Sequence, residues 1–391
     1  MARPISYEMQ MMFVGSSGAF EAASNTGSGI SRLDFVQSYD FSFDVERTPL
    51  RQLGTGVFAT TQTQFAPDVN LNIQYLLNDG WNEKYLGLDL FNDQSGNPFN
   101  SILNSTGDRN FYVTIAQNEG RDQNAQTGLS DNYVLGIGNA YITNYSISVG
   151  VGQLATASCS FVGANANIQN YSSSKYLPSV ETLVSGANAE AASGNFSMAF
   201  IDNSRSTRYL SGFKDVLDGA CPYSKCIVTP TFTPTGSNYP ITFGFFDSVR
   251  DNFQNLEFSV QFERKSLYGF GNNYPYIRKI QKPTIATLTL SSLVDDFQAE
   301  NIAKIFEGEN AAEKSVLVEF FNLNNVKKFE LKLENLTLAS YSLGAQIGDR
   351  VLVNTSWNVE VKDNSDPDIF MSGSFGTPTL YALYTNESLN I

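Results

Sequence analysis

The chain has 391 residues, of which 25 are Lys or Arg, 39 are Asp or Glu and none is His, so the formal net charge is −14. The absence of histidine excludes Ser-His-Asp and Cys-His nucleophiles, His-ligated zinc or iron, and HExxH metalloproteases. A strongly acidic balance argues against a surface that binds nucleic acid tightly, because affinity for phosphate comes from Lys and Arg. With 42% hydrophobic residues the chain is expected to be globular, with two or three domains.

Three cysteines, Cys159, Cys221 and Cys226, are too few for a disulfide framework in so long a chain. Cys221 and Cys226 form the close pair, for which free thiols are favoured over a local bridge. A structural zinc would need soft ligands that this sequence does not supply. The first residues contain no apolar run of signal-peptide length, and no stretch approaches ~18 apolar residues, which indicates synthesis in a cytoplasm and no membrane span.

The sequence repeats itself at two offsets. At an offset of 217, DFSFDVER at 40–47 matches EFSVQFER at 257–264, and the match continues without a gap into a second segment. At an offset of 196, residues 140–147 match 336–343, and Phe161 falls on Trp357. Two blocks in the same order predict two tandem copies of one domain. The expected boundaries are 1–170 for copy one, 171–237 for a connection, 238–363 for copy two and 364–391 for a C-terminal tail.

Alternation of apolar and polar residues predicts strands along both copies. The residues expected to point into the core of the first strand of each copy are Phe41, Phe43 and Val45, and Phe258, Val260 and Phe262. Later strands are expected at 69–77, 111–116, 133–149 and 154–162 in copy one, and at 286–291, 316–321, 328–343 and 350–362 in copy two.

Short helices interrupt this alternation. One is expected around Trp81, Tyr85 and Leu88, its counterpart spans 297–306, and a third lies near 207–218. The expected N-caps of the first two are Asp79 and Asp295 or Asp296. The fold class is therefore mainly β, with two tandem copies of a β-sandwich-like or barrel-like unit and one short helix in each copy.

A long segment separates the first two strands of each copy, at 48–67 and at 265–283. Both segments mix apolar residues with Gly and Pro, and a loop of this length inside a compact domain is usually functional. Exposed apolar side chains there would need a covering surface.

No catalytic arrangement emerges from the motifs. The glycines of 135–140 and 269–273 complete no phosphate-binding pattern, so turn or strand glycines are favoured. Asp295 and Asp296, like the aspartates at 363, 366 and 368, match no calcium or glycosidase spacing, and helix caps or solvated loops are favoured. Arg47 and Arg264 are interpreted as structural arginines, with inter-subunit ion pairs as the alternative. We expect no enzyme activity, no cofactor and no metal.

The polar face of the first strand is acidic in both copies, and these strands carry no Lys there. The acidic residues are Asp40, Asp44, Glu46, Glu257 and Glu263. The simplest interpretation is an ordinary solvated sheet face. The alternative is a surface past which something negatively charged must slide.

Three stretches together resemble the tail tube protein, or major tail protein, of long-tailed bacteriophages in a duplicated form. They are 40–47 followed by the Pro/Gly segment, the strand 69–77 leading into a helix, and 140–161. The resemblance covers about 33–165 and 240–363. It implies rings stacked into a hollow tube, in which an inner sheet lines the lumen and a long loop contacts the next ring.

The resemblance implies a structural virion protein of the tail, assembled in the host cytoplasm into stacked homotrimeric rings. Its partners would be other copies of itself, the tape measure, terminator and distal tail proteins, and phage DNA that passes without specific binding; no membrane is involved. The alternatives are a distal-tail or baseplate ring and, from a third class, a secreted β-sandwich adhesin or carbohydrate-processing enzyme. The expected lumen-facing residues are Asp40, Asp44, Glu46, Asn70, Asn72, Glu257, Glu263, Thr287 and Thr289. The expected ring-stacking residues are Leu50, Leu53, Gly54, Phe58, Leu267, Phe270, Gly271, Tyr274 and Tyr276.

Overall fold

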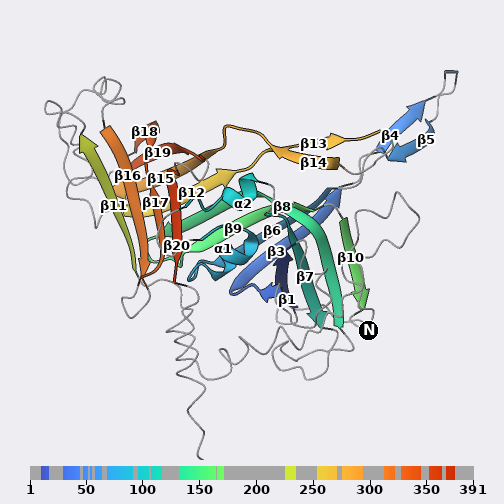
Figure 1. Ribbon diagram of the computed structural model, residues 1–391, viewed down its shortest axis with the longest axis horizontal. Coiled ribbons are helices and arrows are strands. Elements are labelled where there is room, and N and C mark those ends of the chain that lie inside the picture. The colour runs from blue at the N-terminus through green and yellow to red at the C-terminus, as the bar shows by residue number, and fades with distance from the viewer. Residues whose placement is uncertain are drawn as a thin grey trace, which may run out of the picture.

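The structure is a computed structural model that is mainly β, as the alternating pattern predicts (Figure 1). It describes residues 10–16, 30–44, 47–51, 53–54, 58–63, 68–90, 96–104, 107–116, 132–163, 165–170, 225–234, 253–270, 275–293, 312–321, 327–344, 352–362 and 367–374. The elements of the first half are β1 (Gln10–Ser16), β2 (Ile30–Arg32), β3 (Val36–Asp44), β4 (Arg47–Arg51), β5 (Phe58–Thr63), β6 (Asp68–Leu76), α1 (Trp81–Leu86), α2 (Asn100–Leu103), β7 (Arg109–Ala116), β8 (Asn132–Gly150), β9 (Thr156–Gly163) and β10 (Asn165–Asn170). Those of the second half are β11 (Lys225–Pro234), β12 (Phe253–Gln261), β13 (Arg264–Tyr268), β14 (Pro275–Ile280), β15 (Ile285–Leu293), β16 (Ala312–Phe321), β17 (Lys327–Leu333), β18 (Thr337–Gly344), β19 (Leu352–Glu360) and β20 (Ile369–Gly373).

Eight antiparallel strands form one continuous layer, which we call the eight-strand ladder. Its order is β3-β6-β9-β8-β12-β15-β19-β18. The first four strands come from the first half of the chain and the last four from the second half. The two halves join where β8 pairs with β12.

Two outer sheets pack on the apolar face of this ladder and lie at opposite ends of the molecule (Figure 1). In the first half, the N-terminal part of β8 leaves the ladder and pairs with β7 and β10, and β7 pairs with β1. In the second half the order is β11-β16-β17-β20. The rings of Phe111 on β7 and Phe161 on β9 lie 4.6 Å apart, centre to centre, so the layers meet through aromatic contacts.

The strand registers of the two halves correspond at the same two offsets found in the sequence. The pair Phe41 and Leu71 of β3 and β6 corresponds to Phe258 and Leu288 of β12 and β15, each residue 217 positions later. The irregularity near the start of β3 recurs at the start of β12. At an offset of 196, the pairs of β8 with β9 correspond to those of β18 with β19, including the bulge.

The long segments between the first two strands are β-hairpins rather than irregular loops. Hairpin β4–β5 pairs Arg47 with Thr63, and hairpin β13–β14 pairs Arg264 with Ile280, again at an offset of 217. Both hairpins project from the upper side of the molecule in Figure 1. Their Gly and Pro content hides a strand pattern, because those residues break the alternation on which strand prediction depends.

Two strands lie inside segments that the sequence suggested were a connection and a tail. Strand β11, within 171–237, pairs with β16, and β20, within 364–391, pairs with β17. The strand expected at 328–343 is divided, since the chain bends at Glu334–Leu336 between β17 and β18.

The first expected helix is present as α1, but its N-cap lies one residue later than expected. Gly80, with φ of 88°, occupies the N-cap, while Asp79 accepts the Trp81 N–H at 3.2 Å through Oδ1. The left-handed conformation favours Gly at that position, which explains the shift. The helices expected at 297–306 and near 207–218 lie outside the described residues.

Candidate assembly surfaces

The polar face of the eight-strand ladder contains no cation. Neither Lys nor Arg occurs in the ladder strands β3, β6, β9, β12, β15, β18 and β19, or in residues 141–150 of β8. Ser, Thr, Asn and Gln fill most of this face, on the side opposite the buried Leu71, Phe258 and Leu288. Its acidic side chains, all exposed, are Asp40, Asp44, Asp68, Glu257 and Glu360. An ordinary solvated face mixes positively and negatively charged side chains, so the charge composition of this face is unusual.

Most of the residues expected to line a lumen lie on this face. Asp40, Asp44, Asn72 and Glu257 are exposed there, and Glu263, just after β12, is exposed as well. Asn70, Thr287 and Thr289 share the same parity and are half-buried. Glu46 lies outside the described residues.

The opposite face of the ladder is apolar, and the two halves share one continuous core. Phe258 and Val260 are fully buried and Phe262 nearly so, as the alternation predicts. Phe41 is only half-buried and Phe43 is 59% exposed, which differs from the expectation. The difference arises because β12 lies between two strands whereas β3 pairs with β6 alone among the described strands.

The two hairpins that leave the ladder carry positive charge, unlike the strands of the ladder itself. The cationic residues of their strands are Arg47, Arg51, Arg264, Lys265, Arg278 and Lys279. At their tips Leu53 and Phe270 are fully exposed, and Gly54 has a φ of 87° that favours glycine in this turn.

The remaining residues expected to stack rings are placed as follows. Leu267 is exposed on β13, and Leu50, Phe58 and Tyr276 are strand residues of β4, β5 and β14. Gly271 and Tyr274 lie outside the described residues. The described members of the expected set therefore lie on two equivalent hairpins rather than on irregular loops.

The base of hairpin β13–β14 is attached to the first half of the chain. Arg264 and Arg278 each place a guanidinium carbon 4.9 Å from the centre of the Tyr141 ring. Arg264 donates to the Ile102 carbonyl at 3.2 Å, and Arg278 donates to the Asn139 carbonyl at 3.2 Å. Burial raises the pKa of the nearby Asp108 carboxyl, while the charges of both arginines oppose that rise. Arg264 is thus a structural arginine, whereas its counterpart Arg47 is exposed.

A buried polar cluster lies beneath the ladder in the first half. Tyr75 donates to the Glu83 carboxyl at 2.9 Å, and Tyr145 donates to the same oxygen at 3.4 Å. Burial raises the pKa of Glu83 to about 7, and it also raises the pKa of Tyr75. The alternating pattern does not reveal this cluster, although a tyrosine at the inward position of a strand signals that its hydroxyl needs a buried partner.

The described cysteines are free thiols. Cys159 is fully buried beside Tyr75, with the sulfur and hydroxyl 3.8 Å apart, and burial raises its pKa. Cys226 is on β11, where burial raises its pKa to about 12. Thiols with raised pKa values are weak nucleophiles, so neither group supports covalent chemistry. Cys221 lies outside the described residues.

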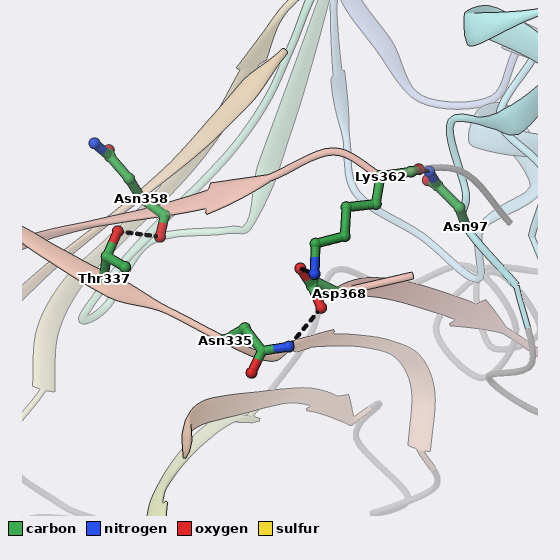
Figure 2. Close-up of polar contacts among 6 residues, drawn as sticks. All are labelled: Asn97, Asn335, Thr337, Asn358, Lys362 and Asp368. Carbon is green, nitrogen blue, oxygen red and sulfur yellow. Dashed lines mark hydrogen bonds and ion pairs between the residues drawn. The ribbon is translucent and has the colours of Figure 1, made fainter. Parts of the chain in front are cut away.

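A small polar network fixes the bend between β17 and β18 (Figure 2). The Asp368 carboxylate, nearly fully buried, accepts from the Asn335 amide at 2.7 Å and pairs with the Lys362 ammonium at 2.7 Å. Asn97 from the first half donates to the Lys362 carbonyl, which links the two halves. Asp368 therefore has a structural role in the fold, and its burial differs from the helix cap or solvated loop that the sequence pattern favoured for it.

Within the described ranges, no group of three or more His, Cys, Asp or Glu side chains is placed to hold a metal ion. Asp295, Asp296, Asp363 and Asp366 are outside those ranges. The helices of the described segments include none with the length and apolar character that crossing a membrane requires.

Comparison with known proteins finds similarity at the level of structure. No protein-family model and no curated protein sequence matches the chain. A chain of the anti-feeding prophage (AFP) baseplate is 12% identical with a TM-score of 0.27, over 40% of this chain and 97% of that one. The anti-feeding prophage cap, which terminates the tube, is 12% identical with a TM-score of 0.24, over 39% and 91%. The Hcp protein is 10% identical with a TM-score of 0.19, over 38% and 98%.

Proposed function

We propose that this protein is the tail tube protein of a long-tailed bacteriophage, three copies of which form a ring that stacks into a hollow tube for DNA passage. The observation that carries the proposal is the eight-strand ladder, whose polar face contains no Lys or Arg. The strand at each end of the ladder, β3 or β18, pairs with one neighbour among the described strands. The sequence pattern described above supports the same function.

The ladder supports the proposed duplication of one domain. Each half contributes four strands in the same order, with registers related by the offsets 217 and 196. Each half also adds one hairpin and one outer sheet. Two copies joined side by side would let one chain occupy two positions of a ring.

Strand geometry supports three chains in a ring. Three chains with eight ladder strands each supply 24 strands, which at a spacing of about 4.8 Å and a tilt of about 40° close into a barrel roughly 48 Å across. Side chains reduce the opening to about 38 Å, which admits a DNA duplex about 20 Å wide. A barrel with half as many strands would leave about 14 Å and exclude the duplex.

The charge distribution supports a lumen on the polar face. DNA adheres where Lys and Arg displace its counterions, and this face offers only neutral and acidic side chains. In the proposed ring the hairpins, with exposed Leu53 and Phe270 at their tips, contact the adjacent ring. The protein then acts structurally rather than as an enzyme, and its partners are further copies of itself and the tape measure, terminator and distal tail proteins of the virion tail.

Negative-stain electron microscopy of the purified chain over a range of concentrations and salt tests the proposal. We expect hollow tubes built of stacked rings, with a lumen of about 38 Å. Single rings that never stack would instead indicate a distal-tail or baseplate component. A chain that stays monomeric where intact virion tails are stable would refute both forms of the proposal.

A further inference from the structure

The two outer strands of the eight-strand ladder each have a partner on one side. Among the described strands, β3 pairs with β6 and β18 pairs with β19, and neither has a second neighbour. Exposed strand edges favour pairing with another strand, and proteins that remain monomeric usually protect them with charge, proline or a covering element. Neither β3 nor β18 contains Lys, Arg or Pro, and the charged residues of β3, Asp40 and Asp44, belong to the polar face.

The middle of the same ladder contains a complete example of how two such edges join. There β8 pairs with β12 without a bulge, and the pairs are Gly150 with Asn255, Val149 with Leu256, Ser148 with Glu257, Ile147 with Phe258, Ser146 with Ser259, Tyr145 with Val260 and Asn144 with Gln261. By the register correspondence, β12 is the counterpart of β3 and β8 is the counterpart of β18.

Burial differs between the joined edges and the outer ones. At the junction, Tyr145 and Val260 are opposite each other and fully buried. Their counterparts are Tyr341 on β18, which is 37% exposed, and Phe43 on β3, which is 59% exposed. An aromatic residue at each outer edge thus occupies the position that becomes buried when the edges meet.

From this internal example we infer that β18 of one chain pairs antiparallel with β3 of a second copy, in the register of the β8–β12 junction. The inferred pairs, given as the β18 residue and then the β3 residue of the neighbouring copy, are Gly344 with Asp40, Leu343 with Phe41, Ser342 with Ser42, Tyr341 with Phe43, and Ser340 with Asp44. The inference rests on the proposed ring, and it adds which edges meet and in which register.

Cysteine pairs test the register directly. Residues directly opposite in antiparallel strands have Cα atoms about 4.5 to 5.5 Å apart, within the range of a disulfide, while a pair displaced by two residues is about 7 to 8 Å apart. The matched variants are S42C with S342C and D44C with S340C. The mismatched variants combine the same positions as S42C with S340C and D44C with S342C.

Each variant is assembled, examined by electron microscopy, oxidised mildly and separated on a denaturing gel without reductant. Both matched pairs should give covalent dimers and trimers and nothing larger, since three links close a ring. The mismatched pairs, the four single variants and the wild-type chain, which controls for the native cysteines, should stay monomeric on the gel. Two matched pairs are used so that failure of one variant to assemble leaves the other decisive.

The possible failures are distinguishable. Rings or tubes that cross-link only in a mismatched pair, or in no pair, would overturn the inferred register while leaving the proposed function intact. Covalent species that grow well beyond trimers would mean that the edges meet in an open chain rather than a ring of three. A wild-type chain that forms neither rings nor tubes would overturn the proposed function and this pairing together.

Discussion

At the residue scale, the Glu83 carboxyl shows how the fold controls a single proton. Tyr75 and Tyr145 both donate to one of its oxygens, while the other oxygen is buried without a partner in the described structure. Burial disfavours the charged form, so the pKa rises from 4.5 to about 7. Because the folded state then holds its proton more tightly than the unfolded state, stability falls as the pH rises from about 4.5 to about 7.

We predict that Glu83→Gln removes most of this pH dependence. Across that window the free energy of unfolding of the wild-type chain should fall on the order of 3 kcal/mol more than that of the variant. Urea denaturation of the unassembled chain between pH 4.5 and 8 measures the difference, with the exposed Glu257→Gln as the control that keeps the wild-type slope. Identical slopes for wild type and Glu83→Gln would show that this carboxyl stays ionised in the fold.

Asparagine appears at both points where a strand passes from the ladder to an outer sheet. Asn139 has a φ of 50° and Asn335 a φ of 52°, and the two are related by the offset of 196. Both are left-handed conformations that Asn tolerates better than most residues. The alternating pattern predicts neither bend, because it runs through both positions as if the strand were continuous. The bend is marked by a single Asn.

We predict that Asn335→Val destabilises the second half by roughly 2 to 4 kcal/mol, through backbone strain and loss of the bond to Asp368. Asn335→Gly should cost less, because it keeps the conformation and loses only that bond. Thermal unfolding of both variants shows which one loses more stability relative to the wild-type chain. An equal loss of stability in both would mean that the backbone conformation of residue 335 contributes nothing.

At the scale of elements, alternation predicts the strands that have one apolar and one polar face. Strands β3, β6, β12 and β15 follow this rule, and so do β9 and β19. It does not predict the hairpins, whose strands contain Pro49 and Pro275, and in β13 the consecutive charges Arg264 and Lys265 fall on both faces. It also misses β11 and β20, because the composition of their surroundings resembles a connection and a tail.

The outer edge β3 gives a prediction for assembly. Phe43→Lys should leave the chain folded, since Phe43 is largely exposed, and should prevent ring formation because the inferred pairing buries this position and burying a Lys charge is costly. Ile168→Lys is the matched control, as Ile168 is an exposed apolar residue on the edge strand β10 of an outer sheet. Mass photometry measures the fraction of each variant that assembles into rings. Rings formed equally well by both variants would exclude β3 from the contact between neighbouring chains.

The hairpin tips give a prediction for stacking. Leu53→Asp with Phe270→Asp should leave rings intact and stop tube growth, since both side chains are fully exposed in the single chain and would be covered by the next ring. The ratio of rings to tubes in electron micrographs measures the effect. Tubes of normal length would place the ring-to-ring contact elsewhere on the molecule.

At the scale of the whole molecule, the sequence indicates two similar halves but not how they meet. Their junction depends on β8, whose 19 residues serve an outer sheet at one end and the ladder at the other. Pairing between strands far apart in sequence leaves no local pattern, so the continuous ladder is visible only in three dimensions. The polar face, by contrast, follows directly from the alternating residues once the ladder is known.

Reversing the charge of that face should change DNA passage and leave assembly intact. We predict that replacing Asp40, Asp44, Glu257 and Glu263 by Lys slows DNA ejection in a manner relieved by salt, because the wall then displaces phosphate counterions. A duplex centred in the lumen would lie about 9 Å from the wall, near one Debye length at physiological salt. Ejection kinetics of assembled tails measure the effect, and unchanged kinetics in tails that carry all four substitutions would contradict a luminal position.

A cryo-EM reconstruction of the assembled protein would show whether the ladder lines a ring of three chains. We expect rings of three chains with near six-fold appearance, whose inner wall is a closed barrel of 24 strands with the polar face of the ladder toward a lumen of about 38 Å. Phe43 and Tyr341 of neighbouring chains would lie opposite each other in that wall. Rings in which the ladder faces outward, or in which β3 and β18 remain uncovered, would contradict it.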